Sequence, residues 1–142
     1  MPVQHNEWSC SVYSYAWVIG ATGVDPGITY DQALQIIGYP DCVNPTYGLM
    51  LSQCMINAFS HYGLHAVEYW STFDEAYSIC SQQTGVINPT GMYHFMGIRG
   101  VDGQEQGDIW CANSAPGYRG IYDSLTRSSF NNLGPTKLIV LD

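Results

Sequence analysis

The chain has 142 residues, of which 46% are hydrophobic, so it can form one domain with a buried core and is too apolar for intrinsic disorder. Its 12 Asp and Glu residues against four Lys and Arg give a net charge of −8 at pH 7, which argues against nucleic acids and anionic membranes as partners. No apolar run approaches the roughly 20 residues of a membrane span, and the first residues lack the regions of a signal peptide. We therefore expect one soluble domain over 1–142. Its location stays open, including outside the cell or in a virion as part of a larger protein.

Four helices are predicted, most of them preceded by a capping residue and followed by glycine. They cover residues 10–21, 30–37, 48–62 and 74–83. The first is apolar or small nearly all round, which is typical of a helix buried on most faces. We expect Ser9 to cap this helix and Thr29 to cap the second one.

Strands dominate the second half of the chain. They are predicted over 65–70, 85–88, 92–100, 108–114 and the closing 136–142, with a short helix near 123–131 before the last strand. Helices first and an antiparallel sheet after indicate an α+β fold. We expect a helical part over about 1–64, a sheet part over about 65–142 and a cleft between the two.

Five cysteines, an odd number, leave at least one thiol without a partner inside a monomer. They are Cys10, Cys42, Cys54, Cys80 and Cys111. Because no Cys/His cluster has the spacing of zinc ligands, the sequence predicts no metal site. Cys10 is the candidate for the unpaired thiol. The other four could form two disulfides or lie in the core as small buried side chains, and we favour buried thiols because nothing indicates secretion.

Cys10 lies in the first turn of the buried helix, where free N–H groups and the helix dipole favour a thiolate. Most lone cysteines are structural, so this position alone does not make it a nucleophile. Gln4 precedes it by six residues, and a side-chain amide there can donate beside the Cys10 backbone N–H. Two such donors would form an oxyanion hole, although Gln4 taken alone could equally be a surface residue.

His94 and Asn113 lie on two strands that we expect to form a hairpin. If the turn pairs Val101 with Gln106, His94 faces Asn113 directly, with Cβ atoms about 4.5–5.5 Å apart. This geometry would allow the amide to hold the imidazole in one tautomer. A histidine of a half-buried strand and an asparagine of a turn remain the ordinary interpretations of these two residues.

The same register sets Arg99 opposite Asp108 as a cross-strand ion pair, which makes Asp108 a weaker candidate for a third catalytic residue. His5, His61 and His65 fit structural roles better than a catalytic one.

Together these residues resemble the papain-like cysteine peptidases. In that clan a Gln precedes the nucleophilic Cys by six residues, as Gln4 precedes Cys10, and an orienting Asn lies in a W-x-x-N-S context, which Trp110, Asn113 and Ser114 match. The compact length is more similar to the bacteriocin-processing, double-glycine-leader branch. The order of the segments CSVYSYAWVIGATG, LSQCMINAFSHYGL and HFMGIRGVDG, then a late helix and a final strand, extends this resemblance over nearly the whole chain.

The chain departs from the pattern at three positions. Ser11 stands where the compact branch usually has Gly, Asn113 where it usually has Asp, and Ala115 where papain has Trp. These departures bear on the shape of the subsites more than on the class of reaction.

The resemblance implies a cysteine peptidase without metal or organic cofactor. Cys10 would be the nucleophile, His94 the general acid and base, Asn113 the residue that orients His94, and Gln4 an oxyanion donor. The partner would be a peptide or protein. The peptide cross-link of bacterial cell wall, as in phage and bacterial lysins, is another candidate substrate, and transfer of the acyl group to an amine would use the same residues. A different class of function, a non-catalytic peptide-binding or assembly domain on the same fold, also stays open.

Overall fold

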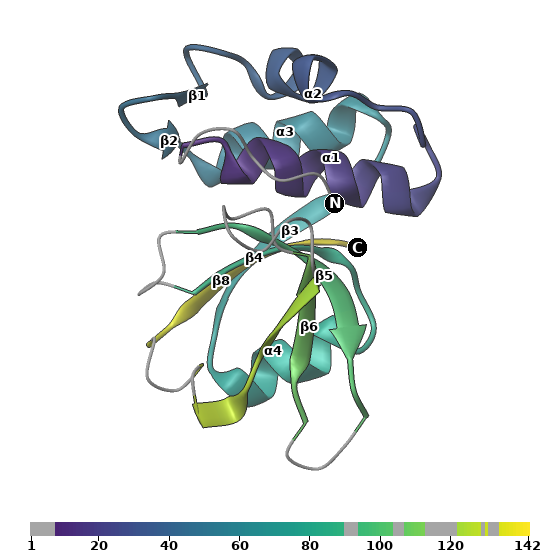
Figure 1. Ribbon diagram of the computed structural model, residues 1–142, viewed down its shortest axis with the longest axis vertical. Coiled ribbons are helices and arrows are strands. Elements are labelled where there is room, and N and C mark those ends of the chain that lie inside the picture. The colour runs from purple at the N-terminus through teal and green to yellow at the C-terminus, as the bar shows by residue number, and fades with distance from the viewer. Residues whose placement is uncertain (1–7, 90–93, 104–106, 113–121, 129, 131–133) are drawn as a thin grey trace.

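The computed structural model describes residues 8–89, 94–103, 107–112, 122–128, 130 and 134–142. Within them the fold is α+β, as predicted (Figure 1). The helices are α1 (Cys10–Thr22), α2 (Tyr30–Ile37), α3 (Ser52–His61) and α4 (Phe73–Cys80). The strands are β1 (Val43–Asn44), β2 (Gly48–Leu49), β3 (Ala66–Ser71), β4 (Gly85–Pro89), β5 (Met96–Val101), β6 (Ile109–Ala112), β7 (Tyr122–Leu125) and β8 (Thr136–Leu141).

Six of these strands form an antiparallel sheet in the order β3-β8-β4-β5-β6-β7, and β1 pairs with β2 apart from it. Helices α1, α2 and α3 lie together over one face of the sheet, and α4 lies on the other (Figure 1). Alternate side chains of the central strands pack on opposite faces of the sheet. Val86 and Ile139 belong to the core under α1, whereas Ile87 and Leu138 belong to the core with α4. The central strands are therefore buried on both faces.

The structure confirms the predicted N-cap of α2. The Thr29 side chain accepts a hydrogen bond from the Gln32 N–H, and the Gln32 side chain accepts one from the Thr29 N–H. At α1 the position of the cap is right but its chemistry differs. The Ser9 side chain makes no capping bond, and its backbone carbonyl instead accepts from Val12 and Tyr13. Gly23, with φ of 82°, ends this helix.

Three predicted helices differ from the structure by more than one residue. The helix predicted over 74–83 spans Phe73–Cys80, after the N-cap Thr72. The helix predicted over 48–62 begins at Ser52, because the residues before it form the β1–β2 hairpin. The Asn44 side chain accepts from the N–H groups of Thr46 and Tyr47 at 2.9 and 3.0 Å and so closes the hairpin turn. The helix predicted over 123–131 was wrong at its start, since 122–125 form β7, paired with β6. Helical residues follow only at 127, 128 and 130 within the described chain.

The predicted hairpin register was also wrong. Val101 pairs with Ile109 rather than with Gln106, so the turn is longer than four residues, and a bulge lies between Ile98 and Gly100. Arg99 lies in this bulge and is not opposite Asp108; its guanidinium carbon lies 5.7 Å from the ring centroid of Trp110. A bulge adds a residue to one strand, and periodicity does not reveal it. The register that set His94 opposite Asn113 therefore does not hold in the described part of the hairpin.

The preference for four buried thiols was wrong for one pair. Cys42 and Cys54 form a disulfide, with Cα atoms 5.8 Å apart. It joins the segment before β1 to the first turn of α3. Cys80 and Cys111 are buried and, like Cys10, are not part of a disulfide.

Candidate active site

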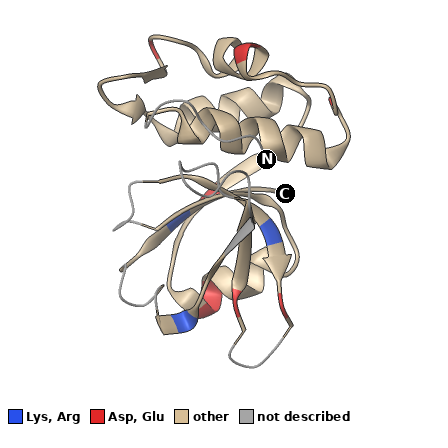
Figure 2. Ribbon diagram, viewed as in Figure 1, with Lys and Arg blue, Asp and Glu red and all other residues tan. Residues whose placement is uncertain are grey.

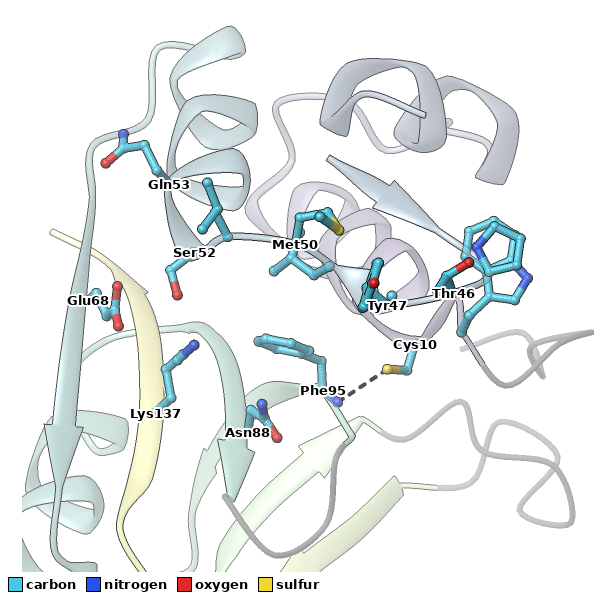
Figure 3. A pocket seen from close by; sticks show the side chains of 15 residues that line it. Cys10, Thr46, Tyr47, Met50, Ser52, Gln53, Glu68, Asn88, Phe95 and Lys137 are labelled. Carbon is cyan, nitrogen blue, oxygen red and sulfur yellow. Dashed lines mark hydrogen bonds between the residues drawn. The ribbon is translucent and has the colours of Figure 1, made fainter. Parts of the chain in front are cut away.

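Cys10 is the first residue of α1, and its side chain lines a cavity between the helical layer and the sheet. The cavity has a volume of about 750 Å³. It is lined by Trp8, Cys10, residues 45–53, Glu68, Asn88, Phe95 and Lys137. Figure 3 shows Cys10 at one end of the cavity, facing Phe95, and Glu68 and Lys137 toward the other end. The cleft expected between the helical part and the sheet part thus exists, and Cys10 opens into it.

Two hydrogen bonds connect α1 to the segment that enters β5. The Phe95 N–H donates to the Cys10 sulfur, with nitrogen and sulfur 3.4 Å apart (Figure 3). The Ser14 hydroxyl donates to the Phe95 carbonyl at 2.9 Å. His94 directly precedes Phe95, so its backbone lies beside Cys10 although 84 residues separate the two along the chain. The predicted nucleophile and the predicted base therefore come from elements that meet in the structure.

Asn88 near the end of β4 is a residue of this region that the sequence did not single out. With its amide nitrogen turned toward them, its side chain donates to the carbonyl oxygens of His94 and Pro89, both at 3.2 Å. Asn88 also lines the cavity beside Phe95 (Figure 3). It therefore ties the residue before Phe95 to the neighbouring strand. An isolated Asn in a predicted strand carries no signal that would have identified it.

Burial raises the pKa of the Cys10 thiol, because a thiolate at this position would lose most of its water. The backbone N–H groups of Phe95, Ser11 and Cys10 lower the pKa by a smaller amount. The side chain is only 7% exposed, which explains why desolvation prevails. The N–H groups at the helix start therefore favour the thiolate, as expected, but burial outweighs them. A thiolate near pH 7 needs a positively charged group close to the sulfur.

The remaining candidates fall into two groups. Gln4 and Asn113, like His5, lie outside the described residues, so their roles stay predictions. His61 and His65 do not line the cavity. His65 lies 3.1 Å from the Asp142 carboxylate, and both side chains are exposed.

The helical side of the cavity is formed by the β1–β2 hairpin and the residues that lead into α3. This wall is apolar and exposed: Tyr47 is 71%, Met50 42% and Leu51 66% accessible. The hairpin could not be predicted from periodicity, because each of its strands has only two residues. The segment NPTYG, with Asn, Pro and Gly close together, is nevertheless a turn signal that could have indicated it.

The end of the cavity away from Cys10 is polar and has one negatively and one positively charged side chain. Glu68 of β3 accepts a hydrogen bond from the Trp70 indole N–H at 2.9 Å. The Lys137 ammonium of β8 lies 5.0 Å from the ring centroid of Trp70. The cavity therefore runs from a thiol at one end to a carboxylate and an ammonium group at the other (Figure 3).

Among the described residues, no group of three or more His, Cys, Asp or Glu side chains could hold a metal ion. In the same part of the chain, no helix combines the length and the apolar character needed to cross a membrane.

The helical layer on an antiparallel sheet, with a cysteine at the start of the central helix, defines a papain-like α+β fold. Among solved structures, the chain is similar to the crystal structure of a double glycine motif protease from an AMS/PCAT transporter in complex with the leader peptide. The two share 17% sequence identity with a TM-score of 0.68, over 99% of this chain and 89% of that one. No family model matches the sequence, and the search of curated proteins gave no match. The likeness is therefore one of fold.

Proposed function

We propose that residues 1–142 act as a single cysteine peptidase domain that hydrolyses peptide bonds with Cys10, His94, Asn113 and Gln4. The contact between the Phe95 N–H and the Cys10 sulfur carries this proposal, because it brings the residue next to His94 against the nucleophile. The likeness in fold to a double glycine motif protease supports the same class of reaction.

In this mechanism a proton passes from the Cys10 thiol to the His94 imidazole, and the imidazolium offsets the cost of burying the thiolate. The thiolate attacks the substrate carbonyl carbon. The oxyanion accepts hydrogen bonds from the Cys10 N–H and the Gln4 amide, donors that are worth about 3–4 kcal/mol each. His94 then protonates the leaving amine and a thioester remains. A water molecule, deprotonated by His94, cleaves the thioester and regenerates Cys10. Asn113 keeps the imidazole oriented throughout.

The substrate in this proposal is an extended peptide. The cavity of about 750 Å³ has the exposed apolar wall at Tyr47, Met50 and Leu51 on one side. A peptide lying there would bury apolar side chains against this wall with its scissile bond at Cys10. The double glycine motif protease of similar fold was solved in complex with a leader peptide, which supports a peptide as the ligand here rather than a glycan.

The pH dependence of Cys10 alkylation tests the proposal. Iodoacetamide labelling of each cysteine is followed by mass spectrometry between pH 5 and 9, in the wild type and in His94→Ala. We expect Cys10 to react well below pH 8 in the wild type and to react about tenfold or more slowly near pH 6.5 in the variant, since the imidazolium is lost. Cys10→Ala should hydrolyse no peptide.

Cys80 serves as the internal control. Burial raises the pKa of its thiol to about 12, so it should stay unlabelled over the whole range while the protein is folded. If Cys10 in the wild type has an ordinary or raised pKa that His94→Ala leaves unchanged, the domain is not a peptidase of this kind, and a binding function takes its place.

A further inference from the structure

We propose that Ser14 is a positioning residue of this site: its hydroxyl anchors the Phe95 peptide and so fixes both the N–H that contacts the Cys10 sulfur and the neighbouring His94. This inference rests on the proposed function of Cys10 and His94.

The geometry of α1 explains why Ser14 can do this. Residues four apart lie on the same face of a helix, so Cys10 and Ser14 both point at the start of β5. Cys10 accepts from the Phe95 N–H at 3.4 Å, and Ser14 donates to the Phe95 carbonyl at 2.9 Å. One residue of the sheet side is therefore held at both of its backbone polar groups by one face of α1.

Phe95 depends on these bonds because of where it lies. It precedes Met96, the first residue of β5, whose pairing with Ile87 is the first described contact of that strand with β4. Phe95 is 9% exposed, so its carbonyl oxygen has little access to water. Ser14 is itself fully buried. A buried carbonyl without a donor is costly, and without the Ser14 hydroxyl this segment should move to find another partner.

A movement of Phe95 would change the chemistry at Cys10 in two ways. It would weaken the hydrogen bond that the Phe95 N–H donates to the Cys10 sulfur, and this bond is one of those that lower the pKa of the thiol. It would also displace His94, whose carbonyl is held from the other side by Asn88. Both effects disfavour the thiolate, so Ser14 should affect reactivity without touching the substrate.

The test compares Ser14→Ala with Tyr15→Phe. Tyr15 is the next residue of α1 and fully buried, and its hydroxyl donates to the Ala58 carbonyl of α3 at 2.6 Å. Tyr15→Phe, like Ser14→Ala, thus removes a buried hydroxyl of α1 that donates to a backbone carbonyl of another element, but it does not involve Phe95. Both variants should melt a few degrees lower than the wild type, since each leaves a buried carbonyl unpaired.

The two variants should differ in the pH profile of Cys10 alkylation. We expect Ser14→Ala to shift the apparent pKa of Cys10 upward by about half a unit to one unit, which lowers labelling near pH 6.5 by about three- to tenfold. Peptide hydrolysis should fall with it, mainly in kcat. Tyr15→Phe should keep the wild-type profile and activity.

The outcomes separate this inference from the proposed function. If the wild type is activated through His94 but Ser14→Ala has the wild-type profile, or if Tyr15→Phe shifts as much, Ser14 is only a structural residue and the inference is overturned. If His94→Ala itself leaves the profile unchanged, the proposed function fails first.

Discussion

At Gly97 the indole of Trp17 lies directly against the backbone of β5. A Cβ atom at this position would lie 2.4 Å from Cε3 of Trp17, far inside van der Waals contact. Gly97 therefore allows α1 to pack closely on the sheet, two residues from Phe95. The spacing between the helix that carries Cys10 and the strand that follows His94 depends on this missing side chain.

Gly97→Ala should consequently destabilise the protein by about 1–3 kcal/mol, the usual cost of an overpacked contact. The Trp17 ring and β5 must separate, so Cys10 alkylation should slow as well. Chemical denaturation and the labelling assay measure the two effects.

Gly27→Ala is the matched control. Gly27 is exposed, and a Cβ there would meet no atom within 4 Å. Its stability should stay within about 0.5 kcal/mol of the wild type. Equal stability of Gly97→Ala and Gly27→Ala would show that Trp17 does not constrain β5.

At the scale of elements, the sequence predicted those features that depend on neighbouring residues of the chain. The α2 cap could be predicted because Thr29 and Gln32 bond to each other's backbone within one turn. Five strands of the large sheet were predicted in the right order along the chain, but β7 was predicted as part of a helix. The β1–β2 hairpin and the β5 bulge could not be predicted in this way, because two-residue strands and single extra residues leave no periodicity.

The site divides in the same manner. Cys10 at the start of α1 and His94 could be singled out from the sequence, although His94 was expected within a strand over 92–100 and instead precedes β5, which begins at Met96. The contribution of Asn88 and Ser14 could not, because each acts on a backbone group that is distant in sequence. The raised pKa of Cys10 was missed for a related reason: it depends on burial by several elements at once, which no local pattern reports.

The disulfide between Cys42 and Cys54 stabilises the element that forms the apolar wall. It closes a loop of 12 residues that contains the β1–β2 hairpin. Closing a loop of this size restricts the unfolded chain and is worth about 3 kcal/mol. Replacing both cysteines by alanine should lower the free energy of unfolding by about that amount and raise KM for peptides, since the wall becomes less fixed.

Dithiothreitol provides the control for this prediction. It should destabilise the wild type to a similar extent and leave the double variant unchanged, as measured by urea denaturation. A wild type whose stability is insensitive to the reductant while the bond is shown to be broken would contradict the prediction.

Across the whole molecule, the positively charged side chains are distributed unevenly, although residues 1–64 and residues 65–142 carry the same net charge. Residues 1–64 contain four acidic residues and no lysine or arginine. The described cations, Arg99, Arg127 and Lys137, all belong to the sheet side of the fold, as Figure 2 shows. With a net charge of −8, the molecule attracts cations over distances longer than those of direct contact.

The negative electrostatic field of the protein should influence which peptides it cleaves fastest. For peptides of equal length around one cleavage site, kcat/KM at low salt should be about tenfold higher with flanking lysines than with flanking glutamates, because the acidic surface steers the basic peptide toward the cavity. Raising the ionic strength from 10 mM to 150 mM shortens the screening length from about 30 Å to about 8 Å, so the difference should shrink. The rate for the basic peptide should fall and that for the acidic one should rise, while a peptide flanked by serines stays nearly constant. A preference that does not change with salt would mean that selection occurs by contact inside the cavity, at Glu68 and Lys137, rather than through the charge of the molecule as a whole.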